Sequence, residues 1–287
     1  MKIRAHETFN LRKGWLRKGV KNILNDPTLF TNKNINTCNQ LGIGTNMVKS
    51  LRYWLIATGI TEEAIDKGKH IQKLTKLGEL INNYDKYFEE DGTQWLIQYK
   101  LATNKDNATA WYWFFNEFNV QEFDKELFVK ELDDYLEAEE FSCSAKMLTD
   151  EYACLLNTYY SKNKEEDPEE TNSCPLTSLK LIIKSEGSVY RKNVPARDGI
   201  PPLIALAVIV AENKSNEINI SELIDKTNSI SKIFNLDRST LFYILEALVK
   251  MDMITMPRTA GLDVVRFSEV YTFDGLVEKY YKSLNGK

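Results

Sequence analysis

The side chains of this sequence best suited to chemistry are polar and basic groups near its start. One set, between Asn34 and Thr58, comprises Thr45, Asn46, Lys49, Ser50, Arg52 and Tyr53. A second set precedes it and comprises Arg12, Lys13, Arg17 and Lys18. Amides, hydroxyls and cations of this kind bind base edges and phosphate oxygens. Both sets therefore predict contact with duplex DNA, although a basic run such as the second can equally be a solvated helix face.

No catalytic set stands out beside these groups. The pair His6-Glu7, close to Arg12, is compatible with a phosphate-handling cluster or with a structural cap or ion pair. The sequence contains no GxxxxGK[ST] phosphate loop, no GxSxG nucleophile turn and no HExxH zinc motif. Its four cysteines form no CxxC pair, which argues against a zinc site. We therefore expect no catalytic residue, no metal site and no cofactor.

The element that must position the first polar set has the pattern of a helix-turn-helix. A short helix with Ile35, Cys38 and Leu41 on one side leads into Gly42-Ile43-Gly44, where glycine permits a tight turn. Thr45 or Asn46 is expected to cap the second helix. Val48, Leu51, Trp54 and Leu55 follow at the spacing of one buried face, which leaves the polar set exposed. The alternative is an ordinary helical hairpin with a polar outer surface.

The flanking segments complete a winged-helix pattern. A basic amphipathic helix is predicted to end at Asn25-Asp26-Pro27, because proline disfavours helical geometry in the preceding residue. Two extended pieces, around 60–65 and 70–75, are joined by Asp66-Lys67-Gly68-Lys69 and predict a β-wing. A helix over 76–84 follows. We expect residues 1–88 to form a basic winged-helix domain.

Charge is segregated along the chain, although the net charge is only −4. Residues 1–60 carry ten basic and two acidic residues, a net charge of +8. Residues 61–180 carry 13 basic and 26 acidic residues, a net charge of −13. Because salt screens exposed charges beyond roughly 8–10 Å, a polyanion beside the N-terminal part responds to the local positive charge.

Three blocks of sequence resemble one bacterial family. They are HETFxLRxGW from His6 to Trp15, LGxGxNMVxxxRxW from Leu41 to Trp54, and TAWYWFFNEF from Thr109 to Phe118. The family is known as domain of unknown function 4007, and the similar blocks span almost the whole chain. Its members often stand beside sulfur-transfer and DNA-modification genes of the phosphorothioation type, or in related phage-defence clusters. The resemblance implies a role in DNA modification or defence, and it carries over no catalytic residue.

The rest of the chain predicts two further domains. Residues 89–185 form an acidic, aromatic-rich helical domain, in which Trp111, Trp113, Phe114 and Phe115 are expected in the core. Residues 186–287 have a second winged-helix order, with helices over 203–212, 222–234, 238–251 and 273–284 and strands over 253–256 and 264–267. The residues expected to be exposed on its third helix are Arg238, Ser239, Phe242, Tyr243 and Glu246. Because this part of the chain has a net charge near zero, they favour protein contact or a supporting DNA contact.

The expected fold is mostly α with small β-wings, as two winged helix-turn-helix domains flanking an acidic α-helical domain. The function favoured is a non-enzymatic DNA-binding or adaptor subunit of a bacterial DNA-modification or phage-defence system. Its partners would be duplex DNA and proteins of that complex, with a homodimer as an open alternative. Other hypotheses are a transcriptional regulator, which would need a dimer and a palindromic site, and a protein-only scaffold. Without a membrane span or a signal-peptide core, a cytoplasmic location is expected.

Overall fold

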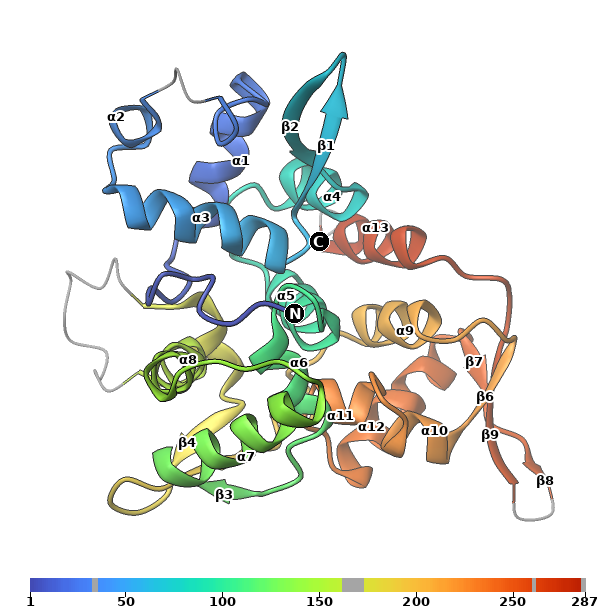
Figure 1. Ribbon diagram of the computed structural model, residues 1–287. Coiled ribbons are helices and arrows are strands. Elements are labelled where there is room, and N and C mark those ends of the chain that lie inside the picture. The colour runs from blue at the N-terminus through green and yellow to red at the C-terminus, as the bar shows by residue number, and fades with distance from the viewer. Residues whose placement is uncertain (33–35, 162–172, 260–261, 285–287) are drawn as a thin grey trace.

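The computed structural model describes residues 1–32, 36–161, 173–259 and 262–284 of the 287-residue chain. It is mostly helical with small antiparallel sheets (Figure 1), which confirms the coarse fold class predicted from the sequence. Ile35, predicted on the apolar side of the first short helix, lies outside the described residues. No helix among the described residues is long and apolar enough to cross a membrane.

The N-terminal part follows the predicted order closely. Its elements are α1 (Trp15–Asn25), α2 (Thr37–Leu41), α3 (Thr45–Ala57), β1 (Thr61–Asp66), β2 (Lys69–Leu74) and α4 (Lys76–Tyr84). β1 and β2 pair antiparallel from Thr61 with Leu74 to Asp66 with Lys69, and they project from the body as a hairpin (Figure 1). Lys67 and Gly68 both have positive φ, as the tight turn between twisted strands requires.

The turn between α2 and α3 corrects one prediction. Gly42 ends α2 in the left-handed conformation, with φ of 63°, as expected. Thr45, however, is the first residue of α3, and Gly44 occupies the capping position without a side-chain bond. The predicted caps, Thr45 and Asn46, are wrong because both residues already lie within the helix. The first turn of α3 therefore has no side chain bound to its free N–H groups.

The middle of the chain contains α5 (Asp91–Thr103), α6 (Thr109–Asn116), β3 (Glu122–Phe123), α7 (Lys125–Ala138), α8 (Ala145–Tyr159), the 3₁₀ helix η1 (Pro175–Leu179), β4 (Ile182–Lys184) and β5 (Tyr190–Lys192). The three strands pair antiparallel in the order β3-β5-β4. Trp111, Trp113, Phe114 and Phe115 of α6 are all buried, which confirms that they belong to the core. These rings are closed off from solvent and do not form a stacking surface.

The C-terminal part contains α9 (Pro202–Ala211), β6 (Glu217–Asn219), α10 (Ile220–Asp225), α11 (Ile230–Ile233), α12 (Arg238–Lys250), β7 (Ile254–Thr255), β8 (Arg258–Thr259), β9 (Leu262–Phe267) and α13 (Phe273–Leu284). Its main sheet has the order β6-β9-β7. The predicted helix over 222–234 is two shorter helices, because Asn228 adopts the left-handed conformation between them. Asp237, directly before α12, caps this helix by accepting a hydrogen bond from the Thr240 N–H.

α13 packs against both α9 and α4, and so joins the end of the described chain to its N-terminal part (Figure 1). The ring of Tyr281 stacks on that of Tyr84 with centroids 5.6 Å apart, and the Tyr84 hydroxyl donates to Glu278 at 3.1 Å. Buried apolar side chains from all three parts of the chain form one continuous core. The division at residues 88 and 185 stays a prediction.

Candidate functional site

The exposed polar surface of α3 is smaller than the sequence predicts. Thr45, Asn46 and Lys49 are exposed on its N-terminal half. Ser50 and Tyr53 were expected on the same surface, but they are 0% and 8% exposed. The expected exposure of these two residues is therefore wrong, because the segment before α1 covers that side of the helix.

That covering segment is held by hydrogen bonds to α3. The Ser50 hydroxyl donates to the Phe9 carbonyl oxygen at 3.4 Å, and the Trp54 indole N–H donates to the same oxygen at 3.0 Å. The Lys49 ammonium lies 3.5 Å from the Glu7 carboxylate. The N-terminal segment is thus fixed along the length of α3.

Arg52 connects α3 to the wing. Its Nε donates to the Glu63 carboxylate of β1 at 3.0 Å, and its Nη1 donates to the Phe30 carbonyl oxygen at 3.2 Å. Its side chain is 37% exposed, so it remains within reach of a ligand. The first bond joins α3 to the wing and the second joins it to the loop between α1 and α2, which gives Arg52 a structural role that the sequence does not reveal.

The basic set at the start of α1 forms a separate site. Arg12, Lys13 and Arg17 line a shallow depression together with Tyr87 and Pro175. The Arg17 guanidinium lies 4.0 Å from the centroid of the Tyr87 ring, in cation–π contact. Lys18 differs from them, since its ammonium donates to the Leu41 carbonyl oxygen at 3.2 Å, beside the α2–α3 turn.

His6 occupies a buried site that joins α3, α6 and α8. Its imidazole is 0% exposed, and its Nε2 lies 3.2 Å from the carboxylate of Glu151, which is itself 2% exposed. Its Nδ1 accepts a hydrogen bond from the Thr8 N–H at 3.1 Å, which places the proton of a neutral ring on Nε2. The rings of Tyr53 and Trp111 pack edge-on against it, each with centroids 6.1 Å away.

The partner of His6 is not the one suggested by sequence proximity. Glu7 contacts Lys49, whereas Glu151, on α8, accepts a hydrogen bond from the Arg4 backbone N–H. Asp150, the residue before Glu151, binds the Arg4 Nε at 2.6 Å. Sequence spacing gave no signal for these contacts. The buried cluster is structural, since it is closed to a substrate.

The backbone around His6 is held in an uncommon conformation. Arg4, Glu7 and Thr8 all have positive φ, between 51° and 69°, which L side chains adopt at an energetic cost. Burial, followed by the Glu151 carboxylate, raises the pKa of Tyr53 well above its ordinary value. Tyr53 is therefore a neutral phenol at physiological pH and does not act as a base.

A family model described as "Protein of unknown function (DUF4007)" matches residues 3–281. No curated protein matches the sequence. Two solved structures match the fold. "Magnesium ion-bound SspB crystal structure" has a TM-score of 0.85 at 20% identity and covers 100% of this chain and 89% of that chain. "SspB crystal structure" has a TM-score of 0.83 at 20% identity and covers 99% of this chain and 87% of that chain.

These structural matches contradict the prediction of a non-enzymatic DNA-binding or adaptor subunit, and one of them carries a magnesium ion. The accompanying prediction that the chain is not an enzyme is wrong for the same reason. The two other non-enzymatic hypotheses, a transcriptional regulator and a protein-only scaffold, are set aside with it.

The described residues do not form a magnesium site by themselves. No three His, Cys, Asp or Glu side chains gather among them in a way that could hold a metal ion. The buried Glu151 has an unpartnered oxygen, Oε2, but it lies beside an imidazole and aromatic rings. Mg²⁺ takes oxygen ligands in near-octahedral geometry and keeps several waters, which this enclosed position does not offer. We therefore assign no residue to magnesium.

Proposed function

The chain belongs to the DUF4007 family, and we propose that it is an SspB-like enzyme that cuts one strand of duplex DNA in a bacterial phosphorothioation-type or phage-defence system. The observation that carries the proposal is the fold match to magnesium-bound SspB over the full length of this chain. The reaction is hydrolysis of a phosphodiester, in which a water oxygen bonds to phosphorus while one P–O ester bond breaks. The resemblance to a family whose members often stand beside DNA-modification genes supports the same biological role.

Two winged-helix units flanking the acidic helical part are the architecture that we propose for this function. The order α1-α2-α3-β1-β2 supports the first unit, and the order α9-β6-α10-α11-α12-β7-β9 with the sheet β6-β9-β7 supports the second. In winged-helix proteins the third helix enters a groove and the wing lies over the neighbouring backbone. The basic first unit is the part suited to DNA.

We place the principal DNA contact on the exposed half of α3 and on the wing tip. Thr45, Asn46 and Lys49 are exposed there, and the uncapped first turn of α3 leaves N–H groups for a phosphate. Lys67 and Lys69 are exposed at the turn of the hairpin. Arg12, Lys13, Arg17 and Lys18 remain candidates for a second contact on α1. The local net charge of +8 in residues 1–60 favours phosphate at this end of the molecule.

The experiment that tests the proposal is plasmid nicking by the full-length chain. Supercoiled plasmid, with and without phosphorothioate, is incubated with the protein in magnesium and in excess chelator. One-strand cutting converts supercoiled plasmid to open circles, and Lys49→Gln slows the conversion. Lys130→Gln, on α7 at a lysine that is exposed like Lys49, is the matched control and leaves the rate unchanged. Plasmid that stays supercoiled under every condition would exclude a nicking enzyme.

A further inference from the structure

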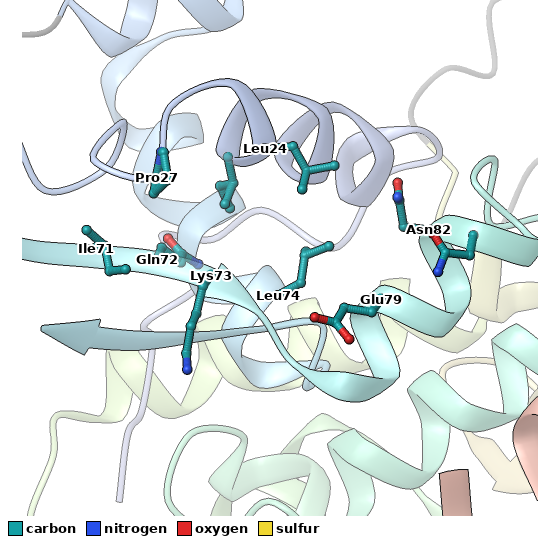
Figure 2. Close-up of a pocket in the computed structure, with 10 residues that line it drawn as sticks. Leu24, Pro27, Ile71, Gln72, Lys73, Leu74, Glu79 and Asn82 are labelled. Carbon is teal, nitrogen blue, oxygen red and sulfur yellow. The ribbon is translucent and has the colours of Figure 1, made fainter. Parts of the chain in front are cut away.

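A cleft of about 500 Å³ lies between the C-terminal half of α1, the β2 strand and α4 (Figure 2). Leu24 and Pro27 line it from the side of α1, and Leu74 lines it from β2. Asn82 and Asn83 lie where α4 approaches it. This volume is typical of pockets that bind small molecules, and the lining of this cleft is part apolar and part polar.

Gln72 supplies an unused hydrogen-bond acceptor in this cleft. Its side chain is 0% exposed, and its Nε2 donates to the Thr61 hydroxyl at 2.6 Å. Its Oε1 is buried and has no partner, although Gln72 lines the cleft. In Figure 2 this oxygen lies on the side of the strand that faces α1. A buried acceptor without a donor is destabilising, so a ligand N–H that reached it would be bound favourably.

The charged groups beside the cleft are already paired. The Lys73 ammonium lies 3.1 Å from the Glu62 carboxylate, and Glu79 lies 3.5 Å from Lys76. The groups left to select a ligand are therefore the carboxamides, each of which can both donate and accept. Apolar side chains beside neutral carboxamides, with the charged groups already paired, favour an uncharged, flat ligand that carries both donors and acceptors.

We propose that this cleft binds a nucleobase that carries an exocyclic amino group, whose N–H donates to Gln72 Oε1. Asn82 and Asn83 then bind the other polar edge of the ring, since Asn and Gln carboxamides match the donor and acceptor pattern of adenine. Leu24 and Leu74 contact its apolar faces.

Two sources can present such a base. One is a free nucleoside, which enters independently of DNA. The other is a nucleotide turned out of a duplex bound to the same unit, and this source rests on the proposed function. Turning out a base breaks its stacking and pairing, and hydrogen bonds to a pocket with a matching edge offset that loss.

The first arm of the test uses free nucleosides and calorimetry. Adenosine is expected to bind the full-length chain, whereas thymidine, which lacks an amino group, binds at least tenfold more weakly. Leu24→Trp fills the cleft from a position that is 55% exposed, and it abolishes adenosine binding. Ile65→Trp is the matched control, since Ile65, on β1, is 69% exposed but does not line the cleft.

The second arm uses a duplex with a single 2-aminopurine, whose fluorescence rises when the base leaves the stack. The wild-type chain is expected to raise the signal, and Leu24→Trp is expected to bind the duplex with unchanged affinity without raising it. If the wild-type chain does not bind duplex at all, the proposed function fails, while the nucleoside arm still tests the cleft.

The acceptor itself is tested by the double substitution Gln72→Met with Thr61→Val. It removes both partners of a buried hydrogen bond together, so that neither is left unsatisfied. Adenosine affinity is expected to fall at least tenfold while the melting temperature is kept. Should the double variant unfold, Asn83→Leu, at an exposed position on α4, tests the opposite wall. The proposal is overturned if the wild-type chain shows neither adenosine binding nor a rise in 2-aminopurine fluorescence. It is also overturned if Leu24→Trp leaves adenosine binding unchanged.

Discussion

Replacing Lys49 by glutamine is expected to weaken duplex binding without affecting the fold. Lys49 is 59% exposed on α3, and its contact with Glu7, at 3.5 Å, is an ion pair at the surface. Exposed pairs of this kind contribute about 0–1 kcal/mol to stability. Three other cations are counted with it: Lys67 and Lys69 at the wing tip, and Arg52, which is partly exposed between α3 and the wing.

The size of the effect follows from the release of counterions. Four cations that each neutralise one phosphate give a slope of log K against log salt of about −3.6, and removing one gives about −2.7. At about 0.15 M salt, one such contact contributes roughly 1 kcal/mol, or about fivefold in affinity. The loss should be the same for every DNA sequence if Lys49 binds phosphate, and confined to certain sequences if it reads a base.

The assay is fluorescence polarisation of a labelled duplex at five or more salt concentrations, with the full-length chain. Lys130→Gln is the control, because this lysine is 69% exposed but belongs to the acidic part of the chain. A wild-type slope near zero would refute the reasoning. So would a Lys130→Gln variant that changed the slope as much as Lys49→Gln.

Three further predictions concern stability. Trp111→Ala should cost about 3–5 kcal/mol in urea unfolding, because the ring is 1% exposed and its loss leaves a cavity; an unchanged transition would show that the ring is not core. Burial, and then the nearby Lys232 cation, lower the pKa of Lys192 from 10.5 to about 7. The unfolded chain therefore binds more protons between these two values, so stability should rise with pH across that range, by at most about 1.4 kcal/mol per unit. Lys192→Met should abolish that rise, and a rise that persisted would assign it to another group. Gly78→Ala should destabilise by about 1–3 kcal/mol, since the new Cβ would lie 2.1 Å from the Ile60 carbonyl oxygen, and thermal unfolding measures the loss.

The sequence predicts best where the signal is local. The turn at Lys67-Gly68 places β1 and β2 in register, and the helix after them has the predicted bounds, Lys76–Tyr84. Asp237 caps α12 as its position before that helix suggests. In each case a turn or cap residue lies within a few positions of the element that it controls, so no distant contact has to be known.

Prediction fails where a distant segment decides the environment. Ser50 and Tyr53 fall on the polar side of α3 by spacing, yet the segment that contains Phe9, some forty residues earlier, covers them. Glu151 reaches His6 from α8, and no periodicity connects two positions so far apart in the chain. The proposed enzymatic function also had no counterpart in the sequence, because it rests on the similarity of the whole fold to SspB and on no short motif.

The position of α13 has a consequence for how the protein is made. This helix contacts α4 through Tyr84 and Tyr281, and it also packs on α9. The ribosome synthesises α13 after every element on which it packs. Until then, the apolar surfaces of α4 and α9 that α13 covers stay exposed on the nascent chain. Exposed apolar surface on an incomplete chain promotes aggregation and attracts chaperones. Slow synthesis of the last third of the chain should therefore lower the yield of folded protein.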